Sequence, residues 1–334
     1  MRRLWLAVAI GGAVGLVAAF ILWRVPADDF VFVPGSAKPL AGHVRVDGRR
    51  AANGQSVRYV DVFVRRTTWL EELLPFLRPD GSALVPEHAL LPPGTTEEER
   101  ERRNRADMER SERIAALVAL RALGYRVVAV PQGALVVAVA PGTPAEGRLE
   151  QGDVIVAADG ERVRTPDELR RVIARRQPGA RVRLTVRRDG KRLELTLGTV
   201  RSPDDPQRPI VGVQVDQEAR IRVPLDVEID LGRVGGPSAG LPFALEIARL
   251  LGRDVTHGCV VAATGELALD GTVVEVGGVA QKTIGARRTG VDVLLVPAGE
   301  NAREAREHAD GLRVVPVESF QQALRFLTTK LENC

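Results

Sequence analysis

Aromatic residues are scarce in this 334-residue chain, where they make up 4% of the sequence. The net charge of +4 is spread along the chain, and no compact basic stripe interleaves with aromatic side chains. Proteins that bind nucleic acids typically carry such a stripe. The composition therefore argues against a nucleic acid as the partner.

The sequence also has few cysteines and no phosphate-binding loop. The two cysteines, Cys259 and Cys334, give neither a zinc-site spacing nor a disulfide framework. Cys259 lies in an apolar run, which predicts a small buried side chain. The sequence has no Gly-rich loop that ends in Gly-Lys-Ser or Gly-Lys-Thr, the signature of an ATPase module. We expect no metal, no cofactor and no ATP.

Lysine is the third scarce residue, and its few positions are informative. It occurs only at positions 38, 191, 282 and 330, although Lys and Arg together number 47. Arg keeps its proton in proteins, whereas a buried Lys can lose it and act as a base. A Lys at position 282 therefore suggests chemistry, with a chance surface Lys as the alternative.

The N-terminus carries the longest apolar run. Arg2 and Arg3 precede an uncharged stretch over 4–23, which Arg24 ends. About 20 apolar residues span a bilayer as a helix, and a cleaved signal peptide has a shorter apolar region. The run predicts an uncleaved transmembrane anchor. Because positive charges favour the cytoplasmic side, residues 1–3 would be a cytoplasmic tip and the rest of the chain extracytoplasmic, at the cell membrane.

Composition and periodicity divide the remaining chain into four parts. Residues 24–122 combine a β pattern with a long helical pattern, which a capping box of Thr96 and Glu99 starts. Residues 123–200 carry short strand patterns and a helix start at Thr165-Pro166. A polar linker follows at 201–208. Residues 209–334 show mixed helix and strand patterns.

The stretch 123–200 resembles a PDZ domain. The resemblance depends on Pro141-Gly142-Thr143-Pro144-Ala145, then Gly152-Asp153-Val154-Ile155, then Asp159-Gly160 and the capped helix. PDZ domains bind extended peptides by adding a strand to a sheet edge. By this resemblance, a carboxylate-binding loop would precede the first core strand, and Gly124, Tyr125 and Arg126 are its predicted residues. A plain spacer domain is the alternative.

A serine lies at a predicted strand-to-helix turn in Gly235-Gly236-Pro237-Ser238-Ala239-Gly240. Backbone N–H groups are free at the start of a helix, and the helix dipole favours negative charge there. An oxyanion formed beside Ser238 would therefore find donors close by. The simpler alternative is a helix N-cap with no chemical role.

A serine nucleophile needs a base, and Lys282 could supply it. A free lysine has a pKa near 10.4, and burial can lower that value by about 3–5 units. The apolar neighbours Val276, Val279 and Ile284 fit a buried site. The pattern predicts a Ser238–Lys282 dyad.

Residues 235–240 and 264–300 resemble the proteolytic domain of Lon-type proteases. The resemblance depends on the Gly-Pro-Ser-Ala-Gly turn, Thr264-Gly265-Glu266-Leu267, Asp270-Gly271-Thr272-Val273 and Val276-Gly277-Gly278-Val279-Ala280-Gln281-Lys282. It implies Ser238 as the nucleophile, Lys282 as the general base and Thr264 as a residue that supports the lysine. Gly236 and Ala239 would contribute to the oxyanion site. Many Lon proteases have Asp where this chain has Gly235.

With the N-terminal run, these parts resemble the membrane-anchored, PDZ-containing, Lon-like serine proteases of bacteria. The predicted fold class is α+β: a transmembrane helix, a PDZ-like β domain and a C-terminal Lon-type α/β proteolytic domain. The predicted function is an ATP-independent serine endopeptidase that cleaves extracytoplasmic or membrane-associated proteins selected by the PDZ-like domain. Because Lon relatives form rings, a homo-oligomer is implied as well.

Two other functions fit parts of the sequence. Gly-Pro-Ser-Ala-Gly also matches a nucleophile elbow, and Asp292 and His308 follow in the order of an α/β-hydrolase-type esterase triad. The domain is small for that fold. A membrane-tethered PDZ scaffold with an inactive Lon-like domain is the non-enzymatic alternative.

Overall fold

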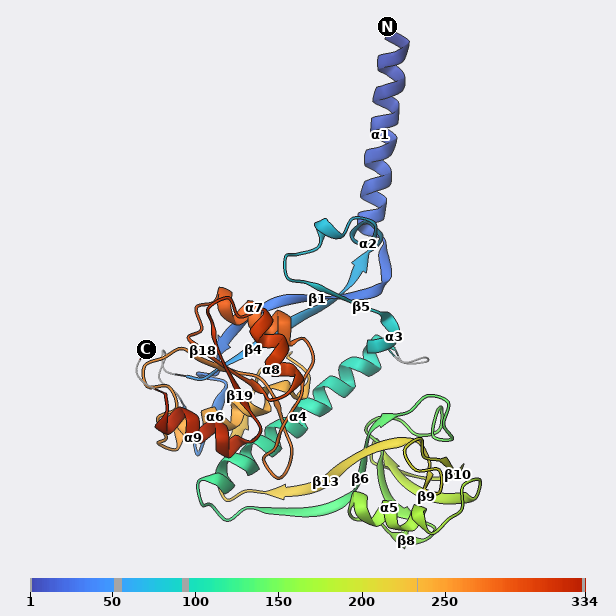
Figure 1. The fold of residues 1–334 in the computed structure, drawn as a ribbon, viewed down its shortest axis with the longest axis vertical. Helices are drawn as coiled ribbons and strands as arrows, with labels where there is room; N and C mark the ends of the chain where they lie inside the picture. Colours follow the sequence, from blue (N-terminus) through green and yellow to red (C-terminus); the bar gives the residue numbers. More distant parts are fainter. Residues whose placement is uncertain (1, 51–55, 92–95, 233, 332–333) are drawn as a thin grey trace. The chain divides into compact units, whose positions relative to one another are not determined.

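The computed structural model describes residues 2–50, 56–91, 96–232, 234–331 and 334. The chain divides into two compact units (Figure 1). Unit 1 combines Met1–Tyr125 with Leu225–Cys334, and unit 2 is Arg126–Pro224. Unit 2 is therefore an insertion in the sequence of unit 1.

Unit 1 is built on a six-stranded sheet of order β19-β18-β15-β4-β1-β5. Its strands are β1 (Pro26–Pro39), β4 (Arg58–Thr68), β5 (Ala83–Val85), β15 (Val261–Ala263), β18 (Val293–Pro297) and β19 (Arg313–Val317). Strands β4, β15, β18 and β19 pair in parallel, whereas β1 pairs antiparallel with β4 and β5. Because Arg58 pairs with Ala262, the first part of the chain completes the sheet of the last part.

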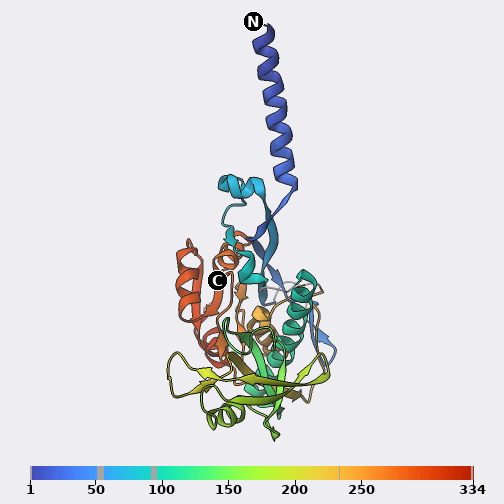
Figure 2. The ribbon, with the colours of Figure 1, turned by 90° about the vertical axis from the view of Figure 1, so that its right-hand side faces the viewer.

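Helices surround this sheet. They are α4 (Glu97–Ala122), α6 (Gly240–Leu250), α7 (Val279–Arg288), α8 (Glu300–Glu307) and α9 (Phe320–Thr329). Small and branched apolar side chains of the sheet pack with α7 and α8, among them Val60, Leu294, Val279 and Ala305. The teal α4 and the orange to red α7 and α8 lie on different sides of unit 1 (Figure 2).

Shorter elements connect these parts of unit 1. Strand β2 (Val44–Val46) pairs with β3 (Arg49–Arg50) and β14 (Val227–Ile229), and β16 (Glu266–Leu267) pairs with β17 (Val273–Val274). The turns include α2 (Trp69–Leu73), η1 (Pro75–Leu77), α3 (Glu87–Leu90) and η2 (Pro237–Ala239). The last of these carries the predicted nucleophile.

The N-terminal run forms a helix, α1 (Arg2–Arg24), but the predicted membrane anchor is wrong. Spanning a bilayer takes about 20 predominantly apolar residues in one helix. Within the described ranges, which omit residue 1, no helix combines that length with that apolar character. The transmembrane helix at 4–23, the cytoplasmic tip at 1–3, the extracytoplasmic catalytic domain and the localisation at the cell membrane are corrected accordingly.

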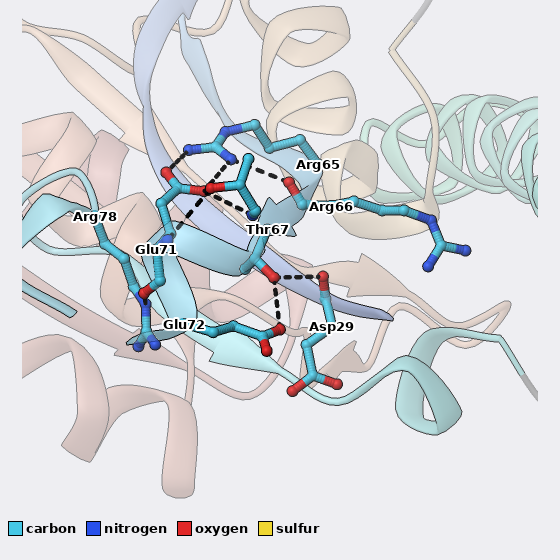
Figure 3. Close-up of polar contacts among 8 residues, drawn as sticks. Asp29, Arg65, Arg66, Thr67, Glu71, Glu72 and Arg78 are labelled. Atoms are coloured by element: carbon cyan, nitrogen blue, oxygen red, sulfur yellow. Dashed lines mark hydrogen bonds and ion pairs between the residues drawn. The ribbon is translucent and has the colours of Figure 1, made fainter. Parts of the chain in front are cut away.

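A polar cluster holds the end of β4 in place (Figure 3). The Thr67 hydroxyl donates to the Asp29 carbonyl at 3.1 Å and contacts a Glu72 carboxylate oxygen at 2.9 Å. Arg65 donates to the carboxylate of Glu71 at 2.8 Å, which lowers the pKa of that carboxyl. Arg78 donates to the Glu71 carbonyl at 2.9 Å. The strand end and α2 are therefore fixed to each other.

Unit 2 is a five-strand sheet path of order β10-β9-β7-β6-β13, with β8 beside β7. The strands are β6 (Val128–Val139), β7 (Val154–Ala158), β8 (Glu161–Arg162), β9 (Arg181–Arg188), β10 (Lys191–Gly198) and β13 (Val213–Arg222). Its helix is α5 (Pro166–Ala174), and β11 (Val200–Arg201) pairs with β12 (Pro209–Ile210). Strands β6 and β13 run side by side over their whole length (Figure 1).

Two sequence expectations differ from this arrangement. The linker predicted at 201–208 and the domain start predicted at 209 both lie inside unit 2, because β13 pairs with β6. The two cysteines form a disulfide with a Cα–Cα distance of 5.0 Å, although no disulfide was expected. The chain brings them together across 75 residues, a separation that spacing alone does not reveal.

Candidate active site

Ser238 lies on a sharp turn between β14 and α6. Gly236 has φ +93, a left-handed conformation that suits glycine, and the turn η2 follows it directly. Helix α6 starts at Gly240, so Ser238 precedes the first helical residue by two positions. This is the place where backbone N–H groups remain free of helical partners.

The main chain of Ser238 is clamped by the segment that follows β15. The backbone N–H of Gly265 donates to the Ser238 carbonyl at 2.9 Å, and the Thr264 hydroxyl lies 3.4 Å from the same oxygen. Gly265 in turn accepts a hydrogen bond from the N–H of Leu241 at 3.0 Å. Thr264 is buried, and it contacts the nucleophile's turn.

Helix α4 supports the same turn from a distant part of the sequence. The buried hydroxyl of Ser111 donates to the Pro237 carbonyl at 3.0 Å. The N–H of Gly236 donates to the Asn104 carbonyl at 2.9 Å. A Cβ at Gly235 would lie 2.9 Å from the Cβ of Asn104. Helix α4 therefore leaves little room for a side chain at position 235, where many Lon proteases have Asp.

Lys282 lies in the first turn of α7, and its side chain is buried. Burial lowers the pKa of Lys282 to about 8, and the carboxylate of Glu304 acts in the opposite direction. Glu304 is held near the start of α7 by the N–H of Ala280, at 3.3 Å. The ammonium group can thus lose its proton at a mildly alkaline pH.

Ser238 and Lys282 line the same cavity, which has a volume of about 580 Å³. Six consecutive residues of β4, Tyr59 to Val64, form one wall. Met108 of α4 and Ala239 also line it. The predicted nucleophile and a lysine that can be neutral therefore line one cavity, an arrangement that suits acyl transfer.

The residues of the esterase alternative are not brought together. His308 lines another cavity, of about 640 Å³, with Glu304 and Glu307. Asp292 accepts a hydrogen bond from the N–H of Val260 at 2.7 Å, beside β15. Neither residue lines the cavity that holds Ser238. The geometry gives no support to a Ser-His-Asp arrangement.

A second groove lies in unit 2, between α5 and β13. It has a volume of about 610 Å³ and is lined by Leu169 and Ile173 of α5 and by residues 209–215. Strand β13 is the last strand of the described sheet path, and its first residues, 213–215, are part of this lining. Gly212 precedes β13 with φ +90, and a Cβ there would overlap Thr143.

The predicted peptide-binding residues lie elsewhere. Gly124 and Tyr125 follow the last turn of α4, where the Tyr125 N–H donates to the Leu120 carbonyl at 2.9 Å. They and Arg126 are not among the residues that line the groove of unit 2.

Sequence reasoning included the Asp107-Met108…Ser111 helix in the family resemblance but gave Ser111 no role, and it missed the β4 wall and the loop at Gly212. Ser111 lies on the apolar second half of α4, so its burial was foreseeable, but its partner was not. The β4 wall showed only a β pattern. Val211-Gly212-Val213, a glycine between two apolar residues just before a strand, was the one local signal for the groove.

Two family models match parts of this chain. Residues 121–199 match the model of the PDZ domain, and residues 214–330 match the model of the Lon protease (S16) C-terminal proteolytic domain. The predicted resemblance to both families and the predicted class of enzyme, a Lon-type serine endopeptidase, are confirmed.

Individual relatives cover only part of this chain. The Lon protease of Mesomycoplasma hyopneumoniae is 34% identical over 28% of this chain and 11% of its own length. Lon protease 2 of Bacillus subtilis is 32% identical over 33% of this chain and 18% of its own length. A crystal structure of the PDZ domain of an SdrC-like protein from Listeria monocytogenes is 21% identical. The match covers 25% of this chain and 87% of that structure's chain, with a TM-score of 0.24. The chain thus spans less than a fifth of the length of these curated relatives.

Proposed function

We propose that this chain, which belongs to the Lon-type serine proteases and carries a PDZ domain, cleaves polypeptides with a Ser238–Lys282 dyad. One observation carries the proposal: a buried Lys282 with a pKa of about 8 lines the same cavity as Ser238. A lysine of ordinary pKa near 10.4 would stay protonated at neutral pH and could not accept the serine proton.

The proposed reaction is acyl transfer in two steps. Neutral Lys282 accepts the Ser238 proton while Oγ attacks the carbonyl carbon of the scissile bond. The proton then passes to the leaving amine as the C–N bond breaks, and an acyl-enzyme remains. Water hydrolyses this ester, with Lys282 again as the base. The backbone N–H of Ala239 is the proposed donor to the oxyanion, whereas the N–H of Gly236, the other predicted donor, already donates to the Asn104 carbonyl.

Thr264 is proposed to support Ser238 rather than Lys282. Its hydroxyl lies 3.4 Å from the Ser238 carbonyl, next to the N–H of Gly265, which donates to the same oxygen. These contacts fix the main chain from which the Ser238 side chain projects. Thr264 is therefore a positioning residue in this proposal.

We propose that the groove between α5 and β13 selects substrates. An extended peptide would add to β13 at residues 213–215, which line the groove, and place an apolar side chain against Leu169 and Ile173. In this proposal the loop at Gly212, which lines the groove, binds the peptide's carboxylate in place of the predicted residues Gly124, Tyr125 and Arg126. Because this chain has no P-loop sequence, the proposed substrates are already unfolded or flexible, and cleavage proceeds without ATP.

The test of the dyad uses the full chain and reduced, carboxymethylated α-lactalbumin as an unfolded protein. Ser238→Ala and Lys282→Ala should each lower the cleavage rate about 1,000-fold or more. The matched control is Lys191→Ala, at an exposed lysine of unit 2. Equal cleavage by all four proteins contradicts the dyad. Binding of the probe without cleavage by any of them supports the scaffold alternative.

The groove needs a separate binding measurement. Labelled pentapeptides that end in a free valine carboxylate are compared with the same peptides ending in valine amide. We expect Ile173→Ala to weaken binding of the free acid, and Tyr125→Ala to leave it unchanged. The reverse pattern would support the loop at 124–126 instead.

A further inference from the structure

Two of the four lysines of this chain line the cavity that holds Ser238. One is Lys282, and the other is Lys38 of β1. The proposed reaction uses Lys282 alone and gives Lys38 no role. A second lysine in the same cavity, in a chain that uses Arg for most of its positive charges, therefore calls for a function of its own.

Lys38 differs from Lys282 in keeping its proton. Its ammonium group donates to a carboxylate oxygen of Asp61 at 2.6 Å, and this hydrogen bond raises the pKa of Lys38. Burial acts on Lys282 in the opposite direction and lowers its pKa to about 8. The cavity therefore holds one lysine that can act as a base and one that remains a cation.

The ion pair with Asp61 leaves part of the Lys38 ammonium group free. An ammonium group has three N–H donors, and within the described ranges Asp61 is the one acceptor that Lys38 bonds. The other carboxylate oxygen of Asp61 accepts the backbone N–H of Ser36 at 2.8 Å. The Asp61 side chain is 10% exposed and the Lys38 side chain 42%. The accessible part of this pair is therefore the cation.

Tyr59 adds a hydroxyl beside this cation. Lys38 of β1 pairs directly with Tyr59 of β4, so their side chains lie on the same face of the sheet. Tyr59 is 6% exposed and lines the cavity, and none of the described residues forms a hydrogen bond with its hydroxyl. Burial raises the pKa of Tyr59, so the hydroxyl keeps its proton and can donate. A ligand that accepts this hydrogen bond removes the cost of a buried donor without a partner.

The rest of the cavity favours an anion over a cation. Among the described residues of its lining, Lys38, Asp61 and Lys282 are the charged ones, and both oxygens of Asp61 already accept hydrogen bonds. The Phe63 ring, whose centre lies 5.6 Å from the Lys38 ammonium, attracts that cation from one side. A basic substrate side chain would approach two lysines and find no free carboxylate. An acidic one would meet a cation and a hydroxyl.

We infer that Lys38 and Tyr59 form a carboxylate-binding subsite of the active-site cavity, which gives the enzyme a preference for substrates with an acidic group near the scissile bond. This inference rests on the proposed function and specifies the substrate of that site. The bound carboxylate accepts one hydrogen bond from the Lys38 ammonium and one from the Tyr59 hydroxyl. It belongs either to an Asp or Glu side chain of the substrate or to its C-terminus.

The test uses matched pairs of acetylated decapeptides made of Ala, Leu and Ser. Each amidated pair carries Glu or Gln at one position, which is moved one residue at a time, and a further pair ends in a free carboxylate or an amide. The Kd of each peptide is measured with the full-length Ser238→Ala variant, and kcat/KM with the wild type. Because the groove of unit 2 is also proposed to bind a terminal carboxylate, the terminal pair is measured with Ile173→Ala added.

We expect the carboxylate member of at least one pair to bind about tenfold more tightly than its amide and to be cleaved with a correspondingly higher kcat/KM. The pair that shows this preference identifies the source of the carboxylate. Equal Kd values within every pair, or no saturable binding, overturn the inference. A preference in binding without any cleavage by the wild type contradicts the dyad instead and leaves the subsite standing.

Variants of the two residues assign the preference to this subsite. Lys38→Met keeps an apolar stem without the charge and should bring the ratio of the two Kd values close to one, whereas Lys38→Arg should retain most of it. Tyr59→Phe removes the hydroxyl alone and should lower the ratio several-fold. The matched control is Lys191→Met, at an exposed lysine of unit 2, which should leave the ratio unchanged. If Lys38→Met weakens both members of a pair equally, the ion pair with Asp61 is only structural and the inference is overturned.

Discussion

At the scale of single residues, the protonation of Lys282 governs the proposed chemistry. Its pKa is lowered to about 8 by burial, and Glu304 raises it in opposition. The base must be neutral, so kcat/KM should rise about tenfold per pH unit below pH 8 and level off above it. Glu304→Gln removes the carboxylate and should move this profile to lower pH. A pH series of kcat/KM measures the profiles of the wild type and of Glu304→Gln, and Glu307→Gln on the same helix is the control. Identical profiles for Glu304→Gln and wild type would contradict the influence of Glu304 on the pKa of Lys282.

The same residue should lower the stability of the protein. A pKa of 10.5 when unfolded and about 8 when folded corresponds to about 3 kcal/mol against the folded state. That penalty is fully present below pH 8, where the folded state must bury a charged lysine, and it disappears as the pH rises to 10.5. Lys282→Met should therefore abolish cleavage and raise the melting temperature at pH 7. The gain should shrink at pH 10, and Lys191→Met should show none.

The sequence singled out Ser238 and Lys282, which the structure places in the lining of one cavity, because their signals are local. Ser238 lies in a glycine-rich turn and Lys282 in an Arg-dominated chain, and both features are visible in short windows. The burial that sets the pKa of Lys282 depends on α7 packing against β1 and β4. Those strands lie far from α7 in the sequence, so a short stretch around Lys282 does not reveal the packing. The hydrogen bond of Ser111 to Pro237 spans 126 residues and was missed for the same reason.

At the scale of elements, α4 supports the turn that carries the proposed nucleophile, Ser238. Ser111→Ala removes the hydrogen bond to the Pro237 carbonyl, a loss of about 1–2 kcal/mol. Because the turn that carries Ser238 would then be less fixed, kcat should fall about tenfold with little change in KM. Steady-state cleavage of the unfolded probe measures kcat and KM separately. Ser111→Thr keeps the hydroxyl and should restore most of kcat, and Ser82→Ala should have no effect. A fall in KM alone would contradict a positioning role.

Elements with strong periodicity were predicted well, and their partners were not. The sequence predicts a helix at 279–289 and a strand at 313–317, and the structure has α7 at Val279–Arg288 and β19 at Arg313–Val317. A strand was also expected at 210–216, but within the proteolytic domain. The structure pairs β13 with β6 in unit 2, and that pairing creates the groove. Strand partners far apart in sequence leave no local trace.

At the scale of the whole molecule, the disulfide between Cys259 and Cys334 closes a long loop around the proteolytic fold. It links the segment before β15 to the residues after α9 across 75 positions. Such a link typically stabilises a protein by about 2–4 kcal/mol, chiefly by restricting the unfolded chain. Reduction should therefore lower the melting temperature. The double variant Cys259→Ala/Cys334→Ala should melt at the temperature of the reduced wild type, with or without reductant. A double variant whose melting temperature still falls with reductant would show that the disulfide is not the cause of the reductant effect.

The pairing of Arg58 with Ala262 also sets an order of events during synthesis. Strands β1 and β4 leave the ribosome early, but β15, β18 and β19 follow only after all of unit 2 has been made. Unit 2 is continuous and can fold as soon as β13 is complete. The sheet of unit 1 is complete only when its last strands have been made, and Lys282 is not buried until then. Under the proposed function, a nascent chain could therefore bind peptides with unit 2 before it can cleave them.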